Sequence, residues 1–490
     1  MMDNHLGRVA LVHNHEVDGY PPPPYSPQCE FPEYPWRRRG PLDKTNANKN
    51  DVYSLVRESL RLLEMDGSKF GTDSWNPLGD LIKPGDTVLI KPNFVHHHNS
   101  SGGGTDCLVT QGAVIRPLID YAALAMNGTG KLILGDAPLQ LCDFKKLLKV
   151  SGVESLMGFY AEMGITIQPK DFRAVVSHKD GLGIFVQGDN ETPGPEEYVP
   201  VNLKKSSALC SLDGNSSGYR VTCYSPSAMA IRHKPGRHEY LIAKSVLSAD
   251  VVINIAKMKT HNKAGVTGAL KNTVGINTNK EFLPHHRVGA PGEGGDEYRQ
   301  KSYWKRACSR FLDRGNESDS RLSRYWYHFA SMACWGMIKL FNKDMTWEGS
   351  WPGNDTLWRM VLDLNKILLY ADKEGNIQPI PQRKLLCVVD GIIAGELQGP
   401  LSPIPRPAGV ILCGSSAPMV DALMATVMGF DWRNVPCIRE AMKGLGMESS
   451  GITVVSNKED LCGALDQRHR LFSFTPPRFW ESLRIAGNRG

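Results

Sequence analysis

The sequence lacks the short motifs that mark the commonest cofactor sites. Its eleven cysteines are scattered, and no C-x-x-C pair occurs. This spacing excludes a ferredoxin-type iron–sulfur cluster and the usual zinc-knuckle arrangement. The Walker pattern G-x-x-x-x-G-K-[ST] and the dinucleotide pattern G-x-G-x-x-G are also absent. We therefore expect no iron–sulfur cluster and find no nucleotide-binding fingerprint.

Strong net charge and long apolar runs are absent too. A net charge of +6 over 490 residues argues weakly for anionic ligands and against a nucleic-acid-binding protein. The most hydrophobic window, Phe329 to Phe341, is too short and too polar at its flanks to span a bilayer. We interpret it as a core segment, with a membrane-surface helix as the alternative. The N-terminus has no signal-like apolar run, so we expect a cytoplasmic protein without a transmembrane segment.

Four runs, "VLI", "LILG", "VVINI" and "LLCVV", are continuously apolar rather than alternating. Continuous runs are typical of strands that are covered on both faces. Amphipathic helices separate several of them, and strand–helix–strand order implies parallel pairs with right-handed crossovers. The sequence therefore predicts an α/β fold with a mostly parallel sheet flanked by helices.

The N-terminal part contains seven prolines between Gly19 and Trp36. Such a segment cannot be a helix or a central strand, so we predict an extended Pro-rich arm that wraps the body or contacts a partner. We also predict a helical insertion, because residues 299–351 show no clear strands. The expected organisation is 1–45, strand and arm; 46–298, first α/β part; 299–351, helical insertion; 352–470, second α/β part; 471–490, tail.

Polar side chains follow each of the four apolar runs. In open α/β sheets ligands bind at the carboxyl ends of the strands, so these positions predict a site before any family is considered. The candidates at the strand ends are Lys91 and Asn93, Asp136, Lys257, Lys259 and His261, and Asp390.

The segment after the third run, "AKMKTHNKAGVTGALKN", combines positive charge with small residues. Lys257 and Lys259 share one strand face roughly 7 Å apart. They predict a clamp for a carboxylate or phosphate, or else salt bridges to Asp136 or Asp390. Gly265 and Gly268 allow close backbone approach, either to a ligand or to a neighbouring element. A helix starting near Thr267 would aim free N–H groups at the same anion and place Lys271 and Asn272 one turn further on.

A Gly-rich loop with His285, His286 and Arg287 follows. Polar loops of this length are usually functional lids or disordered. Because adjacent histidines point in different directions, at most one of the pair would join His261 at a metal. The sequence thus permits a divalent metal site without specifying one.

Several of these blocks resemble the domain of unknown function 362 family. The resemblance rests on "VLIKPNFV", "LILGDAP", "LSADVVINIAKMKTHNKAGVTGALKNTVGI", "VVDGIIAGELQGP" and "VDALMATVMGF", from about Val88 to Phe430. It implies an α/β fold. Some members carry ferredoxin-type cysteine motifs, which this chain lacks. The Pro-rich arm resembles members associated with bacterial surface-polysaccharide synthesis, which implies a link to that process.

The chain is also loosely similar to the lactate racemase family, which uses a nickel-pincer nucleotide. His261, Gly265, Gly268, Lys271 and then His285 or His286 stand in the family's order. The resemblance implies that His261 relays a proton, that Lys271 anchors a ligand and that His286 binds metal. Two departures are Ala269-Leu270, where the family has paired glycines, and Asp136, where it has a strand-end histidine.

Together these features favour a cytoplasmic bacterial enzyme that acts on a small anionic substrate, such as a sugar acid or a nucleotide-linked sugar. Acid/base chemistry of an isomerase, racemase or lyase type is expected, and metal assistance stays open. His261, Asp136 and Lys271 are the catalytic candidates. The remaining groups would bind substrate: Lys91, Asn93, Lys257, Lys259, Gly265, Gly268, Asn272, Arg287 and Asp390. The alternative is a non-catalytic binding or assembly protein that docks a partner through the arm. No nucleic-acid partner is expected, and a homo-oligomer stays open.

Overall fold

A computed structural model describes residues 7–27, 31–36, 51–179, 185–189, 197–215, 218–222 and 224–484. The ends of two predicted segments, the arm beyond residue 36 and the tail beyond residue 484, lie outside the described residues. None of the helices in the described ranges combines the length and apolar character that crossing a bilayer requires.

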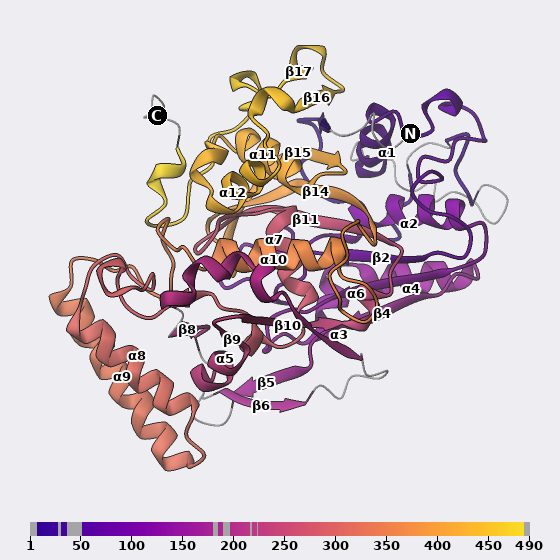
Figure 1. Cartoon of the computed structure of the whole chain (residues 1–490). Coiled ribbons are helices and arrows are strands. Elements are labelled where there is room, and N and C mark those ends of the chain that lie inside the picture. Colours follow the sequence, from indigo (N-terminus) through magenta and orange to yellow (C-terminus); the bar gives the residue numbers. More distant parts are fainter. Residues whose placement is uncertain are drawn as a thin grey trace.

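One large sheet forms the centre of the molecule (Figure 1). Its strands lie in the order β17-β16-β1-β15-β14-β11-β2-β3-β4, and β12 pairs with β11. The five from β14 to β4 are mutually parallel, while β15 is antiparallel to both of its neighbours. The bounds are β1 Arg8–His13, β2 Thr87–Pro92, β3 Lys131–Asp136, β4 Ile167–Asp171, β11 Val251–His261, β12 Gly265–Thr267, β14 Lys384–Gln398, β15 Ser402–Gly414, β16 Thr453–Ser456 and β17 Gly463–Ala464.

Helices cover both faces of this sheet, which confirms the α/β prediction. Along β11, Val251, Ile253 and Ile255 belong to one hydrophobic cluster, and Val252 and Ala256 belong to the other. The first cluster contains buried residues of α1 Val52–Leu62, α2 Gly112–Met126 and α4 Val153–Glu162. The second contains those of α10 Leu357–Tyr370, α11 Ala417–Val427 and α12 Pro436–Gly444. Burial on both sides explains why the strand sequences are continuously apolar.

The middle of the chain adds small sheets and short helices beside the main sheet. They are β5 Val175–Lys179 with β6 Phe185–Asp189, β7 Tyr198–Asn202 with β10 Arg237–Ala243 and β9 His233–Lys234, β8 Tyr219–Arg220 with β13 His286–Arg287, and the helices α3 Phe144–Val150, α5 Pro226–Arg232, α6 Lys244–Leu247 and α7 Ala269–Asn272. The predicted helical insertion is present as α8 Tyr303–Asn316 and α9 Arg321–Phe341.

The Pro-rich arm packs on its own chain. Tyr25, Tyr34 and Trp36 are buried in the cluster that contains α2. Trp36 Nε1 donates to Asp120 Oδ1 at 2.8 Å, and Arg116 donates to the Pro24 carbonyl at 2.7 Å. Of the two predicted roles, wrapping the body is therefore the one that the described arm residues adopt.

Candidate functional site

A cavity of about 810 Å³ opens at the carboxyl edge of the parallel strands. Its wall combines strand-end residues with the turn between β14 and β15 and with the loops around residues 285 and 348. This is where the topology of an open parallel sheet places ligands. The ionisable and amide side chains that line it are Asn93, His96, Asp136, Gln140, Asn262, Lys259, His261, Lys263, Lys271, Asn272, Lys280, His285, Glu348 and Gln398.

Asp136 lines this cavity and forms an ion pair with Lys91, which was expected to bind substrate but is buried and does not line the cavity. The two charged atoms lie 2.8 Å apart and both side chains are buried. Asp136 also accepts the backbone N–H groups of Phe94 at 2.7 Å and Ala137 at 2.8 Å. Burial raises the pKa of Asp136 and Lys91 opposes this shift. Both carboxylate oxygens of Asp136 therefore accept hydrogen bonds inside the protein, and its catalytic role stays a prediction.

An amide chain runs from this pair along the cavity. Asn272 Oδ1 accepts from Lys91 at 3.2 Å and from Asn93 Nδ2 at 3.0 Å. Its Nδ2 donates to Asn254 Oδ1 at 2.7 Å. Asn93 Oδ1 is buried and has no hydrogen-bond partner among the described residues. Gly275 also lines the cavity, and a Cβ there would lie 1.7 Å from Asp136 Oδ1.

Lys257 and Asp390 form a second buried pair that does not line the cavity. Lys257 Nζ lies 3.0 Å from Asp390 Oδ2 and 2.5 Å from the Tyr20 hydroxyl, which in turn donates to Asp390 Oδ1 at 2.6 Å. The expectation that Lys257 and Lys259 together clamp an anion is therefore corrected. Lys257 forms the salt bridge to Asp390 that was the alternative, and of the two lysines Lys259 lines the cavity. The strand pairing shifts register between Lys257 and Lys259, which separates their environments.

Three lysines reach the cavity without a carboxylate partner of their own. Lys259 donates to the Leu108 carbonyl, and Lys280 approaches the Ala137 carbonyl at 3.4 Å. Lys271 has no hydrogen-bond or ion-pair partner among the described residues. Burial lowers the pKa of Lys259 to about 7, with Lys257 adding to the shift, and lowers those of Lys271 and Lys280 to about 8. Within the described part of the chain, the cavity is therefore lined by more lysines than carboxylates, and no carboxylate forms an ion pair with Lys271, although Asp136 opposes the lowering of its pKa.

His261 enters the cavity with a fixed tautomer. Its Nδ1 accepts the backbone N–H groups of Lys263 at 3.0 Å and Ala264 at 3.2 Å in the turn after β11. Burial, followed by Lys271 and Lys259, lowers the pKa of His261 well below its ordinary value, so the ring is neutral. The single ring proton must then sit on Nε2, which has no protein partner among the described residues. His261 thus presents a hydrogen-bond donor to the cavity.

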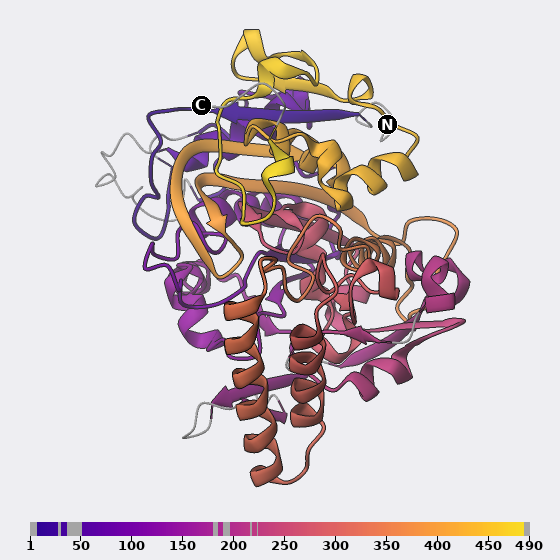
Figure 2. The same cartoon turned by 90° about the vertical axis from the view of Figure 1, so that its left-hand side faces the viewer.

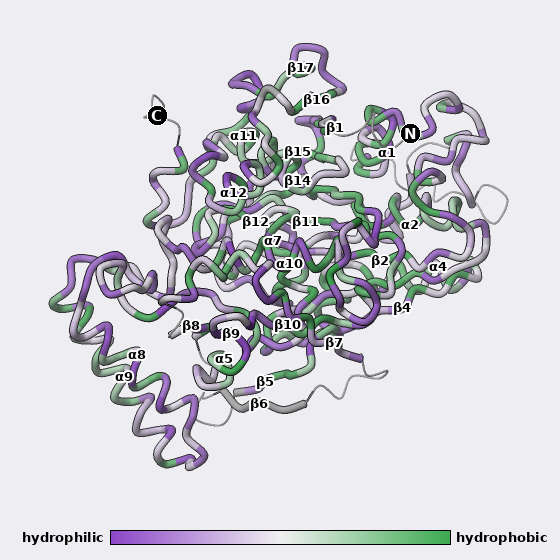
Figure 3. Tube along the Cα trace, in the orientation of Figure 1, coloured by the Kyte–Doolittle hydropathy of each residue, from purple (hydrophilic) through white to green (hydrophobic). Residues whose placement is uncertain are grey.

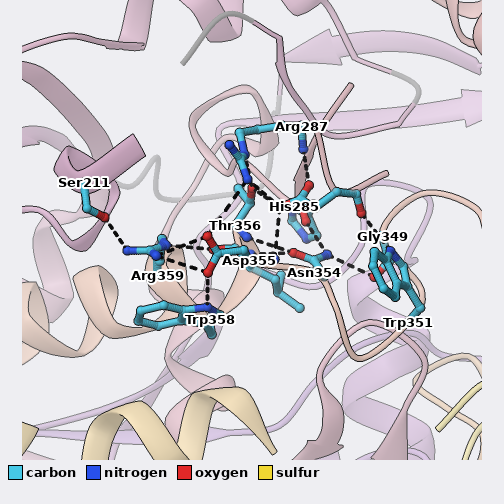
Figure 4. Close-up of polar contacts among 12 residues, drawn as sticks. Ser211, His285, Arg287, Gly349, Trp351, Asn354, Asp355, Thr356, Trp358 and Arg359 are labelled. Carbon is cyan, nitrogen blue, oxygen red and sulfur yellow. Dashed lines mark hydrogen bonds and ion pairs between the residues drawn. The ribbon is translucent and has the colours of Figure 1, made fainter. Parts of the chain in front are cut away.

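His285 shows the opposite tautomer. Its Nδ1 lies 2.8 Å from the Leu283 carbonyl, which can only accept, so Nδ1 carries the proton and Nε2 keeps a lone pair. Burial and the nearby lysines lower its pKa well below the ordinary range. Asn354 fixes the backbone here by donating to the carbonyls of His285 at 2.8 Å and Gly349 at 3.0 Å (Figure 4). The same contacts hold the loop that brings Glu348 to the cavity wall.

His286 and Arg287, the next residues, do not line the cavity. Arg287 donates to Thr356 at 3.3 Å and lies 3.6 Å from Asp296 and 4.0 Å from Asp355, so its charge is used inside the protein (Figure 4). His286 is buried, and its Nδ1 has no hydrogen-bond partner in the part of the chain that the structure describes. Within the described ranges, the group of three ligand-type side chains close enough to share an ion is Cys210, Asp213 and His238, outside the cavity. Neither His285 nor His286 belongs to such a group among the described residues, so the expectation that one of them binds a metal stays a prediction.

The small residues before Lys271 serve packing rather than ligand approach. Asp421 of α11 accepts the N–H groups of Ala269 at 2.6 Å and Leu270 at 2.9 Å, so the start of α7 is already capped. A Cβ on Gly268 would lie 2.2 Å from Asp421, and Gly265, at φ +82°, faces Trp480. The expectation that the N-terminus of this helix binds an anionic ligand is therefore corrected, because Asp421 already accepts its N–H groups. Close packing, the alternative, accounts for both glycines.

Sequence reasoning missed Lys280 and Glu348 and did not select Lys263. Lys263 lies 3.4 Å from Glu348 across the cavity mouth. Lys263 belongs to the cationic segment after β11 and could have been included on that signal. Lys280 and Glu348 stand in irregular segments with no strand end or motif beside them, so only the fold brings them to the site.

Comparison with known proteins identifies one family. Residues 160–426, just over half of the chain, match the family described as "Domain of unknown function (DUF362)". No curated protein matches the chain. A crystal structure of a protein from Thermotoga maritima aligns at 10% identity with a TM-score of 0.30, covering 73% of this chain and 54% of the other. The chain thus spans about half the length of that solved protein.

Proposed function

This chain belongs to the DUF362 family, whose description names no activity, and we propose from the cavity that it is an enzyme that moves a proton on a small anionic substrate. The observation that carries the proposal is the pairing of two neutral histidines of opposite tautomer with an unpaired lysine in one cavity. A base and a hydrogen-bond donor that face one substrate can move a proton at a carbon next to a carbonyl or carboxylate, as isomerases, racemases and lyases do.

The lysines supply the binding. An anion at Lys271 would provide the ion pair that the described residues do not, and Lys259 lies on the same cavity wall. Charge-assisted hydrogen bonds to a carboxylate or phosphate are roughly twice as strong as neutral ones. The volume of about 810 Å³ falls in the range of ligand pockets and leaves room for more than a single acid group. A sugar acid or a nucleotide-linked sugar fits this combination of size and charge.

The histidines supply the chemistry. His285 Nε2 would accept a proton from a carbon of the bound substrate and return it to carbon, and the neutral His261 would donate a hydrogen bond from Nε2–H to the oxyanion that develops in between. Their low pKa values keep both rings neutral near pH 7, so each is already in the form that its step needs. Lys259, with a pKa of about 7, is a third group that exchanges protons near neutrality.

Deuterium exchange tests this proposal whatever the product of the reaction is. Sugar acids, sugar phosphates and nucleotide sugars would be incubated with the protein in D₂O, and mass spectrometry would report deuterium at carbon. We expect exchange into at least one acid, lost in His285→Gln and in His261→Gln and kept in His98→Gln, an exposed control outside the cavity. Equal exchange in all variants, or none with any acid that binds, would reject the assignment.

Several finer expectations stay predictions. Metal assistance, a cytoplasmic location and a link to surface-polysaccharide synthesis are each compatible with this site but not required by it. The alternative of a partner-docking arm is less favoured, because Tyr25, Tyr34 and Trp36 are already buried against the chain's own body.

A further inference from the structure

The hairpin of α8 and α9 stands out from the rest of the molecule. Figures 1 and 2 show both helices extending away from the main sheet, joined at a tip far from it. Cys308, Cys334 and Ile338 are the buried apolar residues between the two helices, and partly buried residues such as Phe311 and Trp335 pack against them. Hydrophobic and hydrophilic residues alternate along both helices (Figure 3). Other large apolar side chains of the hairpin, among them Leu322, Phe329 and Leu340, are exposed.

One side of α9 carries a row of large exposed apolar side chains. Leu322 is 81% exposed, Trp326 60%, Phe329 73% and Leu340 76%. At 3.6 residues per turn these four lie within an arc of roughly 60°, and the exposed Ala333 and Gly336 continue the same row. Met332 and Phe341, 71% and 67% exposed, flank it. A contiguous apolar row of this kind marks a binding surface rather than an ordinary protein exterior.

The hairpin also holds most of the net charge of the chain. Residues 303–341, the span of α8 and α9, contain seven Lys or Arg and three Asp or Glu, a net +4 against +6 for the whole sequence. Within α9, Arg321, Arg324 and Lys339 stand near the two ends and no acidic residue occurs. The apolar row is thus bracketed by positive charge.

We propose that the α8–α9 hairpin docks on an anionic membrane surface, with α9 lying in the lipid interface. A helix with Trp, Phe and Leu on one side and Arg and Lys around them has the composition of interfacial helices. Trp is favoured at the headgroup level. The helix lies on the bilayer and does not cross it, in keeping with its hydropathy and with the charges it contains.

Charge decides between the bilayer and a second copy of this chain. Two α9 helices packed face to face would bring together two copies of Arg321, Arg324 and Lys339 with no acidic residue on either helix, and like charges across an interface are unfavourable. Anionic lipid supplies the opposite charge and an apolar layer at once. The prediction that the window Phe329–Phe341 lies in the core is therefore only partly right. Cys334 and Ile338 are buried, but the side with Phe329, Met332 and Leu340 is not.

Vesicle flotation with the full-length protein tests this inference. Vesicles of phosphatidylcholine alone would be compared with vesicles that contain about one third phosphatidylglycerol. We expect capture by the anionic vesicles, weaker capture at high salt because the charges are screened, and a loss of about tenfold or more in Trp326→Ser/Phe329→Ser/Leu340→Ser. The control Ile231→Ser/Ile380→Ser/Leu445→Ser removes three exposed apolar residues outside the hairpin and should float like wild type.

Three results would overturn the proposal. One is no capture by anionic vesicles, and a second is equal loss in the control variant. The third is a wild-type dimer, measured by light scattering, that the hairpin variant converts to a monomer while neither protein floats, since a second copy would then cover the face. Unchanged circular dichroism and melting temperature of the hairpin variant would show that the lost capture is not caused by unfolding.

Discussion

Lys257 and Lys271 come from one segment of the chain, yet their surroundings differ completely. Lys257 is fully buried, 3.0 Å from Asp390 and bonded to Tyr20. Lys271, fourteen positions later, faces the cavity with no carboxylate partner among the described residues, and burial lowers its pKa to about 8. The comparison shows that lysines of one motif can have different roles. Lys257 forms a buried ion pair within the fold, whereas Lys271 faces the cavity, where a ligand could bind it.

Breaking the buried ion pair of Lys257 and Asp390 should have the largest effect, a loss of stability. Asp390→Asn leaves Lys257 buried without its counter-charge, which typically costs about 3–5 kcal/mol of unfolding free energy. Urea unfolding followed by circular dichroism would measure it. The double variant Lys257→Met/Asp390→Leu should recover most of the loss, because it removes both charges together. A loss below about 1 kcal/mol in Asp390→Asn would show that the pair contributes little.

Removing the charge of Lys271 should lower the affinity for an anionic ligand and leave stability largely unchanged. Lys271→Met is expected to fold normally and to lose about tenfold or more in affinity for a small carboxylate or phosphate, since hydrogen bonds to charged groups contribute about 1.5–3 kcal/mol. Calorimetric titration would measure this, with the exposed Lys443→Met as the matched control. Wild-type affinity should also fall as pH rises above about 8, where Lys271 loses its proton. Unaltered affinity in Lys271→Met would refute its role.

The smallest effect concerns stability against pH. The pKa of Lys271 is about 8 in the fold against 10.5 ordinarily, so between these values the unfolded chain binds more protons. The destabilising charge is fully present below pH 8, and stability should rise with pH through this window. Because the side chain is in part open to the cavity, screening limits the gain to ~1 kcal/mol. Unfolding of wild type minus Lys271→Met, measured across this window, isolates it; a flat difference would contradict the depressed pKa.

Much of the frame follows from sequence alone. The apolar runs became β2, β3, β11 and β14, and the polar residues after them do cluster at one edge of the sheet. The strands could be predicted because burial on both faces requires apolar residues along the whole strand. The position of the site could be predicted because the carboxyl ends of parallel strands lie at one edge of the sheet. Asp136, Lys259 and His261 could therefore be placed without coordinates.

Partners in space could not be predicted in the same way. Asp421 caps α7 from a segment 152 residues away, and Tyr20 joins Lys257 from the arm. No local pattern encodes either contact, so the roles of Gly268 and Lys257 were open until the fold was known. The exposed face of α9 is a similar case, since an apolar window predicts burial but does not say whether protein or lipid covers it.

The tautomers of His261 and His285 are the most direct test of the proposed acid–base site. Nitrogen NMR of protein labelled at histidine, assigned with His261→Gln and His285→Gln, reports which ring nitrogen carries the proton. Because burial and the nearby lysines lower both pKa values well below the ordinary one, the account predicts two neutral rings at neutral pH, His261 protonated at Nε2 and His285 protonated at Nδ1. Rings that share one tautomer, or that take up a second proton near the ordinary histidine pKa of about 6.5, would contradict it.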